Sequence, residues 1–456
     1  MKKRMCKIMA LAMTAAMVVP MAAQTTAFAA DDKEITYWNI AVESPDKDIV
    51  TAAVDKFNKE TKSGYTVNQV AIQNDTYKEK LVIAMSSGEC PDMYSSWSGG
   101  PMYEYIDSGF AQPIDDLLDQ SDVKDKLLDA AIEQGSYNGH VYAIPYLNVS
   151  LAGIFYNKDM FKQYGLEEPK TLADLENICA TLKENGITPF ALANASKWTG
   201  SMYFMSLAAR YGGLEPFQNA VAGTGKFTDD CFIKAGEKIQ EWVKNGYFPD
   251  GVNSLSEDDG QAKQLLYQET AGMMLGGSFY TGAFQTDSEE FYQKKIGWFP
   301  IPAIDDSDAD PTIQIGTVGD QFISFNCEGD KLAAAFECAA DHLSDEVEDM
   351  IYSTGKIAPV KDAGDHISDP VVKEIFDAAQ EASSIQLWYD QYLPTSVASA
   401  HLDGLQEVFG LTKTPQEAQE EMQTAMDEYL STKSDSGAAD DTAEEATDDA
   451  AADDAE

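Results

Sequence analysis

The feature that most constrains the fold is a regular alternation of short apolar runs with amphipathic stretches, which begins at Glu34. Three runs have the length and composition of strands, and the two stretches between them carry apolar residues at helical spacing. The strands are predicted at residues 35–38, 65–72 and 92–96, and the helices at residues 49–57 and 77–87. Strands that alternate with helices form a mostly parallel sheet, and ligands bind outside the carboxyl ends of its strands. Trp38 and Trp97 stand at two of these ends.

A second unit begins near Leu151 and continues the α/β pattern to about Leu430. Thr171 is a candidate N-cap for a helix that Asn185 and Gly186 end. A strand followed by a glycine-rich turn is predicted within residues 273–282, and further strands at 296–303 and 317–326. The chain is therefore predicted to hold two α/β units.

The first 30 residues have the three-part layout of a secretory signal peptide. A positive start is followed by an apolar stretch from Ile8 to about Ala23 and by the A-x-A pattern at residues 27–29. Thr14 and Pro20 interrupt the apolar stretch, which is short of the ~20 residues of a membrane-spanning helix. We expect cleavage after residue 29 or 30 and an exported chain. Cys6 lies in the charged region, so no lipid anchor is predicted.

The charge of the chain excludes several partners. Seventy-seven acidic residues against 32 basic ones give a formal net charge of −45, or −49 without the four basic residues of the signal peptide. Nucleic acid and anionic lipid both require a basic surface. A neutral or cationic ligand is favoured instead. Residues 431–456 are rich in Ala, Asp and Glu without apolar periodicity, and this acidic tail is predicted to be disordered.

Motifs for catalysis, metals or cofactors fail at required positions. The nearest match to a phosphate-binding loop has Ala220 for its first glycine, and an EF-hand-like run has Pro311 where glycine belongs. Ser278 lacks the second glycine of a nucleophile elbow, and the four histidines show no metal spacing. Paired carboxylates can serve a glycosidase, but among 77 acids a pair carries no information. Five cysteines remain after residue 30 with no C-x-x-C, which favours buried free thiols.

Aromatic side chains stand repeatedly beside short polar ones. The pattern occurs at Trp38-Asn39, Trp97-Ser98, Lys197-Trp198-Thr199 and Trp388-Tyr389-Asp390. A sugar ring presents an apolar C–H face and a rim of hydroxyls, so it needs an aromatic plate together with polar partners. Ordinary core packing explains any single tryptophan equally well. The only arginine after residue 30 is Arg210, which disfavours ligands with carboxylates or phosphates.

Six stretches occur in the order seen in a known family. The chain resembles the extracellular solute-binding proteins of ABC transporters, in the branch that binds oligosaccharides of the maltose and raffinose type, over residues 35–430. The stretches that carry the resemblance cover residues 86–100, 139–161, 196–204, 276–284, 318–326 and 386–394.

The resemblance implies a two-lobe α/β fold of the periplasmic-binding-protein type, with a hinge and an interlobe cleft. Residues 31–147 and 318–355 would form one lobe, residues 148–317 and 356–430 the other, and the chain would cross near residues 148, 317 and 355. The cleft residues that it implies are Trp38, Asn39, Glu43, Trp97, Ser98, Trp198, Phe279, Trp388 and Asp390. Many relatives have Trp in place of Phe279, and relatives in single-membrane bacteria usually carry a lipid-modified cysteine.

Three functions follow as hypotheses. The favoured one is a monomeric, non-enzymatic receptor that delivers a neutral oligosaccharide to an ABC permease, without metal or cofactor. The second is a secreted glycoside hydrolase, which needs two carboxylates across a cleft, one of them with a raised pKa. The third is a sugar sensor that presents its closed form to a membrane kinase.

Overall fold

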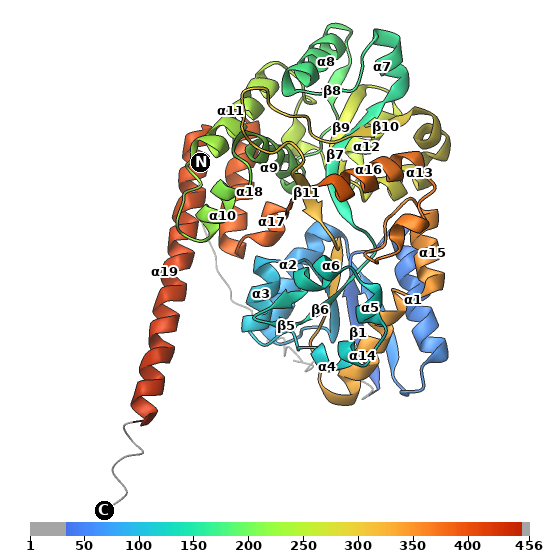
Figure 1. Cartoon of the computed structure of the whole chain (residues 1–456), viewed down its shortest axis with the longest axis vertical. Coiled ribbons are helices and arrows are strands. Elements are labelled where there is room, and N and C mark those ends of the chain that lie inside the picture. The colour runs from blue at the N-terminus through green and yellow to red at the C-terminus, as the bar shows by residue number, and fades with distance from the viewer. Residues whose placement is uncertain (1–32, 449–456) are drawn as a thin grey trace, which may run out of the picture.

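A computed structural model of the chain describes residues 33–448, so the predicted signal peptide lies outside the described residues. The described residues form two lobes, each built on its own sheet (Figure 1). Over residues 33–448, no helix combines the length and apolar character needed to cross a membrane.

The first lobe is built on a five-stranded sheet with the order β2-β1-β3-β12-β6. Its strands are β1 (Glu34–Asn39), β2 (Thr66–Ala71), β3 (Met93–Ser96), β6 (Ala143–Tyr146) and β12 (Gln321–Phe325). Its helices are α1 (Asp46–Glu60), α2 (Asn74–Ser87), α3 (Gly100–Asp107), α4 (Asp115–Asp119), α5 (Val123–Lys126), α6 (Asp129–Gln134), α14 (Gly329–Asp341) and α15 (Asp345–Ser353), and a small hairpin joins β4 (Ser136–Tyr137) to β5 (His140–Val141). The first three strands are parallel, as the βαβαβ pattern predicts, and β12 runs antiparallel to β3 and β6.

The second lobe is built on a six-stranded sheet with the order β13-β11-β7-β9-β8, and β10 also pairs with β7. Its strands are β7 (Ser150–Asn157), β8 (Thr188–Phe190), β9 (Ala271–Gly277), β10 (Ile296–Phe299), β11 (Gln314–Thr317) and β13 (Ile385–Gln386). Its helices are α7 (Lys158–Tyr164), α8 (Leu172–Glu184), α9 (Trp198–Gly212), α10 (Glu215–Val221), α11 (Asp230–Lys244), α12 (Gln261–Tyr267), α13 (Tyr280–Lys295), α16 (Pro370–Glu381), α17 (Tyr389–Tyr392), α18 (Thr395–Phe409) and α19 (Pro415–Asp448). Helix α8 begins at its predicted N-cap, where Thr171 and Asp174 form a capping box.

The chain passes between the sheets in short segments that meet at one buried residue, Asn148. The first segment joins β6 to β7, and the second joins β11 to β12. Asn148 is fully buried in the first segment, and its amide oxygen accepts a hydrogen bond of 2.8 Å from the backbone N–H of Ile357. Its backbone carbonyl accepts one of 2.7 Å from the N–H of Asp320 in the second segment. One asparagine therefore connects three chain segments at the junction between the lobes.

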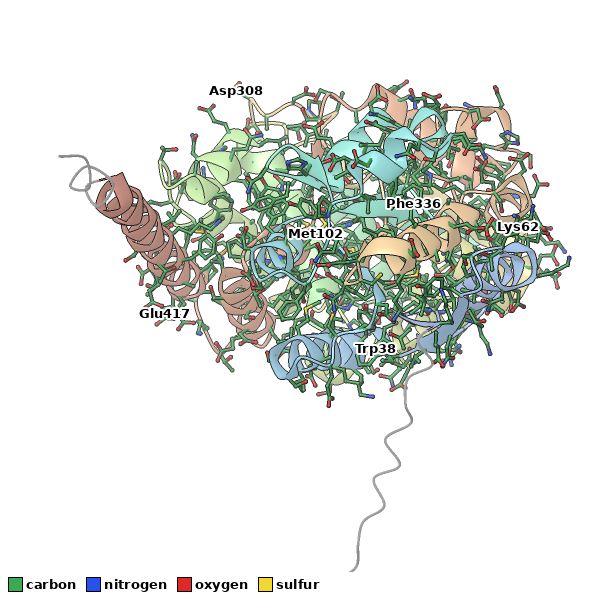
Figure 2. All side chains as sticks on the ribbon, turned by 90° about the horizontal axis from the view of Figure 1, so that it is seen from below. Trp38, Lys62, Met102, Asp308, Phe336 and Glu417 are labelled. Carbon is green, nitrogen blue, oxygen red and sulfur yellow. The ribbon has the colours of Figure 1, made fainter. Side chains whose placement is uncertain are left out.

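Two expectations for the chain differ from the structure. Residues 317–326 were expected to form one strand, but they contain the end of β11 and all of β12, which belong to different sheets. The residues between the two strands cross from one lobe to the other. The tail expected to be disordered from residue 431 is helical as far as Asp448, because α19 continues to that residue and projects from the body of the molecule (Figure 1, Figure 2), and residues 449–456 lie outside the described residues. A helix already anchored by packing can extend without a new nucleation step.

The five cysteines expected to be free are free in the structure. Cys179, Cys231, Cys327 and Cys338 are buried, and Cys90 is half-buried. Burial raises the pKa of the Cys90 thiol to about 12. These thiols therefore pack as small apolar side chains rather than as reactive groups.

Candidate functional site

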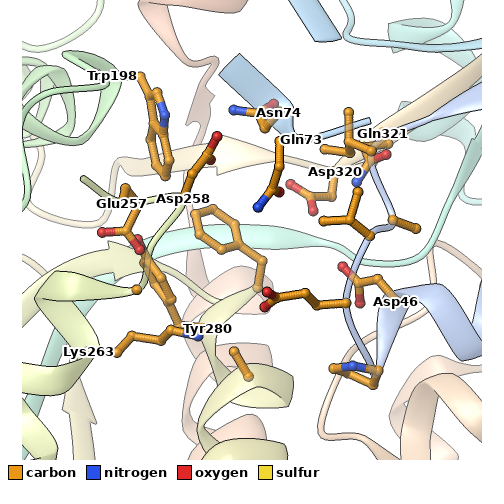
Figure 3. A pocket seen from close by; sticks show the side chains of 18 of the residues that line it. Asp46, Gln73, Asn74, Trp198, Glu257, Asp258, Lys263, Tyr280, Asp320 and Gln321 are labelled. Carbon is orange, nitrogen blue, oxygen red and sulfur yellow. The ribbon is translucent and has the colours of Figure 1, made fainter. Parts of the chain in front are cut away.

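A cavity of about 960 Å³ lies between the two lobes (Figure 3). The first lobe contributes the loops that follow β1 and β2, together with Trp97 just beyond the end of β3. The second lobe contributes the start of α9, the loop before α12, the turn between β9 and α13, and α17. Asp320 and Lys356 line it from the segments near the lobe junction. The cavity therefore opens at the carboxyl ends of the first three strands, as expected for a parallel sheet.

Aromatic side chains from both lobes line this cavity. Trp198 and Phe279 lie edge to face with ring centroids 6.1 Å apart, and Trp97 faces them from the first lobe with the ammonium group of Lys78 5.0 Å from its ring. Trp388 also lines the cavity, although only 4% of its surface is exposed. The indole N–H of Trp198 is buried and makes no hydrogen bond among the described residues.

The local sequence explains where Trp198 points. Asn194 is fully buried, and its amide oxygen accepts a hydrogen bond of 3.0 Å from the N–H of Gly200. Lys197 has the positive φ of 66° that turns the chain into α9. Because these contacts hold the first turn of α9, the indole of Trp198 projects into the cavity rather than into the core.

Six of the nine side chains expected in the cleft line the cavity, namely Glu43, Trp97, Trp198, Phe279, Trp388 and Asp390. The other three, Trp38, Asn39 and Ser98, do not. Residues 35, 37 and 39 are the buried face of β1, so Trp38 points to the opposite face and packs against the cluster that contains Tyr77 and Leu81 of α2. Asn39 is fully buried, and its side chain accepts a hydrogen bond of 3.0 Å from the N–H of Ala41. These residues support the loops behind the cavity.

Most of the polar lining was not predicted from the sequence. The acids and lysines that were not predicted are Asp46, Glu257, Asp258, Asp259, Asp287, Asp320, Lys78, Lys263 and Lys356, and the amides include Gln73, Asn74 and Gln321. Tyr280 follows the expected Phe279 directly, and its position beside the glycine-rich turn is the one signal that was available. The acids of the lining could not be distinguished from the many other acidic residues of the chain by their local sequence.

Carboxylates greatly outnumber cations in the lining. Eight carboxyl groups (Glu43, Asp46, Glu257, Asp258, Asp259, Asp287, Asp320 and Asp390) face three lysines (Lys78, Lys263 and Lys356). Each lysine already pairs with one of them: Lys78 with Asp390 at 3.5 Å, Lys263 with Asp287 at 2.9 Å, and Lys356 with Asp46. Five carboxyl groups of the lining therefore have no lysine partner among the described residues.

Three of these carboxyl groups have raised pKa values. Burial raises the pKa of Glu257 to about 8, although the Tyr280 hydroxyl and the charge of Lys263 both act to lower it. Burial also raises the pKa of Asp258, and the nearby charge of Asp75 adds to this effect. Burial raises the pKa of Asp320 to about 7 against the charge of Lys356. The cavity thus contains carboxyl groups that are poorly solvated and poorly paired.

Polar contacts also join the lobes at the rim of the cavity. The hydroxyl of Ser196 donates a hydrogen bond of 2.6 Å to the carboxylate of Asp75, and the Lys78–Asp390 pair crosses between α2 and α17. Glu104 of α3 accepts hydrogen bonds of 3.0 and 2.6 Å from the N–H and hydroxyl of Thr395. Within residues 33–448, no three His, Cys, Asp or Glu side chains converge to hold a metal ion.

Known proteins with the same arrangement identify the family. A structure from work on xylan utilization by the thermophilic bacterium Caldanaerobius polysaccharolyticus superposes with a TM-score of 0.78 at 30% identity, over 86% of this chain and 99% of that one. An uncharacterised ABC transporter extracellular-binding protein of Pyrococcus horikoshii is 31% identical over 50% of each chain. A multiple sugar-binding protein of Streptococcus mutans is 30% identical over 40% of this chain and 38% of its own length.

The aligned residues of this chain span about half the length of these curated relatives. The family match covers more, because it extends from residue 41 to residue 340 and so includes most strands of both sheets and most of the cavity lining. The two-lobe α/β fold expected from the sequence is confirmed by the structural match. The chain belongs to the family of bacterial extracellular solute-binding proteins.

Proposed function

We propose that this protein is the exported receptor of a carbohydrate ABC importer and binds an oligosaccharide in the cavity between its lobes. The observation that carries the proposal is a cavity of about 960 Å³ that combines aromatic faces with a polar lining from both lobes. The relative from Streptococcus mutans is named as a multiple sugar-binding protein, and the similar solved structure comes from work on xylan utilization. Both associations agree with a saccharide ligand.

Binding would follow from two kinds of contact. The rings of Trp97, Trp198 and Phe279 cover the apolar faces of sugar rings, while carboxylates and amides accept and donate hydrogen bonds at the hydroxyl rim. A hydrogen bond to a charged group contributes ~1.5–3 kcal/mol, and an unmatched buried hydroxyl costs ~1–3 kcal/mol, so hydroxyl positions select the ligand. Rotation of the lobes about the segments at Asn148 would close the cavity on the ligand and present a matched surface to the permease.

One specific observation favours the hydrolase hypothesis. Glu257 has the raised pKa, about 8, that a general acid needs, and it lies in a cleft lined with other carboxylates. The receptor hypothesis predicts that oligosaccharides remain intact after prolonged incubation with the protein. Product analysis by chromatography distinguishes the two, because turnover of the bound glycan would show an enzyme. The sensor hypothesis predicts in addition a complex with a membrane kinase rather than with a permease.

Calorimetry against a panel of oligosaccharides tests the proposal directly. The Trp198→Ala variant should bind the best ligand about tenfold more weakly, because it loses a stacking face worth ~1–1.5 kcal/mol. The matched control is Trp242→Phe, since Trp242 lies in the core of the second lobe and not in the cavity. No binding to any oligosaccharide, or equal binding by Trp198→Ala and the parent protein, would contradict the proposal. Trp388→Ala extends the test to the tryptophan that precedes α17 in the same lobe, with circular dichroism to verify folding.

A further inference from the structure

One corner of the cavity contains polar atoms that nothing in the described chain satisfies. Glu257 precedes α12 and is only 9% exposed, and its Oε2 atom is buried without a hydrogen-bond partner. Tyr280, at the start of α13, is 5% exposed, and its hydroxyl is also without a partner. The two groups are close neighbours, since the Tyr280 hydroxyl acts to lower the pKa of Glu257 and Glu257 raises that of Tyr280, yet neither buried oxygen has a partner with full hydrogen-bond geometry. Figure 3 shows them on one side of the cavity with Asp258 beside them and Trp198 above.

The two lobes bring further negative charge to this corner. Asp258 belongs to the second lobe and Asp75 begins α2 in the first, and the charge of Asp75 raises the pKa of Asp258 and of Glu257. Ser196 holds Asp75 in place with a hydrogen bond of 2.6 Å. Because like charges repel more strongly as water is excluded, closing the lobes here costs free energy unless the carboxyl groups take up protons or a positive charge enters with the ligand.

The described chain supplies no unpaired cation to this corner. Lys263 acts on Glu257 but forms a salt bridge of 2.9 Å with Asp287, and Lys78 acts on Asp258 but pairs with Asp390 at 3.5 Å. A metal ion is a poor candidate, since no three ligating side chains converge within residues 33–448. Trp198 and Phe279 instead offer aromatic faces, which attract organic cations as well as the C–H faces of sugar rings.

We propose that the cleft prefers a saccharide that carries a protonated amine, with the ammonium group held by Glu257, Asp258 and Tyr280. The inference rests on the proposed receptor function and specifies its ligand class. The ammonium donates hydrogen bonds to the two carboxylates and to the Tyr280 oxygen, which satisfies the unpartnered atoms of the corner. The rest of the saccharide stacks against Trp198 and Phe279.

The direction of the pH dependence distinguishes an ammonium from a hydroxyl at this corner. The groups that face Glu257 are Asp258 from its own loop, Lys263 of α12, Tyr280 of α13 and Asp75 of α2. With its pKa of about 8, Glu257 must lose a proton to bind a cation. Binding of the amine therefore strengthens between pH 6 and pH 8, by at most tenfold per unit, and releases a proton. A neutral sugar that accepts a hydrogen bond from protonated Glu257 would bind more weakly over the same range.

Matched saccharide probes test the proposal by calorimetry. The probes are maltotriose, cellotriose and xylotriose, each reduced to the neutral alditol and converted to the 1-amino-1-deoxy alditol, with spermidine and Ca²⁺ as sugar-free cations. At pH 7 and low salt, we expect at least one amino alditol to bind at least tenfold more tightly than the neutral alditol of the same trisaccharide. Its observed binding enthalpy should change with the ionisation enthalpy of the buffer, as proton release requires.

Variants of the mature chain assign the preference to the corner. Glu257→Gln and Asp258→Asn should reduce the ratio between the affinities for the amino and neutral alditols at least fivefold, whereas the exposed Asp308→Asn should leave it unchanged. If the neutral alditols bound as tightly as the amino alditols, the inference would be overturned and the receptor function would remain supported. Binding of spermidine alone, without any saccharide, would retain the cation site but overturn both the saccharide class and the receptor function proposed above. Calcium binding that depends on Glu257 would show a metal site and overturn the inference.

Discussion

Replacing Glu257 by glutamine should stabilise the ligand-free protein at neutral pH. In the folded protein, burial raises the pKa of this carboxyl from its ordinary 4.5 to about 8. In the unfolded chain the same group ionises freely from pH 4.5 upward. Folding at pH 7 must therefore either protonate the group again or bury its charge. Glutamine has nearly the same shape and no charge, so it avoids this cost.

The size of the effect follows from the two pKa values. A carboxyl with a raised folded pKa contributes its full stability below pH 4.5 and loses it progressively as the pH rises to about 8. At pH 7 the loss extends over roughly 2.5 pH units at ~1.36 kcal/mol each, or about 3 kcal/mol. Glu257→Gln should therefore raise the free energy of unfolding by about 3 kcal/mol at pH 7 and by almost nothing at pH 4.5.

Urea unfolding of both proteins at pH 4.5, 6, 7 and 8 measures this difference, and other titrating groups cancel in the comparison. The matched control is Asp287→Asn, which removes an acid of the same cavity that pairs with Lys263 at 2.9 Å. That control should lose up to ~1 kcal/mol at pH 7, the opposite sign. A Glu257→Gln variant that is less stable than the parent at pH 7, or whose gain does not depend on pH, would refute the argument.

Three further changes test other parts of the structure. In Gly100→Ala the new methyl group would lie 2.3 Å from the carbonyl oxygen of Leu393 in the other lobe, so urea unfolding should show a loss of ~1–3 kcal/mol and calorimetry a weaker ligand affinity. Arg210→Met leaves the carbonyls of Ile301 and Ile313, bound at 2.7–3.1 Å, without their buried donor, and we expect a loss of ~2–4 kcal/mol in urea unfolding. Burial lowers the pKa of His401 to about 3, so stability falls as the pH drops below 6.5, by about 2 kcal/mol at pH 5; in the same urea assay His401→Gln should lack this loss.

The sequence predicted those helices and strands whose pattern of apolar and polar residues is visible within the element itself. The three parallel strands of the first lobe and helix α8 with its cap at Thr171 lie close to their predicted positions. Residues 317–326 were predicted as one strand because the end of β11 and all of β12 are buried and lie only three residues apart. Only pairing with β7 in one sheet and with β3 and β6 in the other separates them, and such pairing is not encoded locally.

The same distinction applies to the cavity. Trp198 was predicted because it stands beside polar residues, a pattern visible in a few letters of sequence, whereas Phe279 was implied by the family resemblance alone. Trp38 follows the predicted strand end but does not line the cavity, because it lies on the face of β1 opposite the buried Ile35 and Tyr37, an alternation that the position at a strand end does not reveal. Glu257 has no local signature, since an acid in a polar loop resembles dozens of others until tertiary packing buries it.

The burial of Glu257 connects the stability of the fold to the proposed binding step. A chain selected only for stability would hold glutamine or an apolar residue at this position, because the free carboxyl costs about 3 kcal/mol at pH 7. The cost persists while Oε2 and the Tyr280 hydroxyl lack partners, and a ligand that donates hydrogen bonds to both would recover part of it on binding. If so, Glu257→Gln should raise stability and weaken amine binding together, whereas a purely structural carboxyl would change stability alone. Unfolding and calorimetry on the same variant decide between these outcomes.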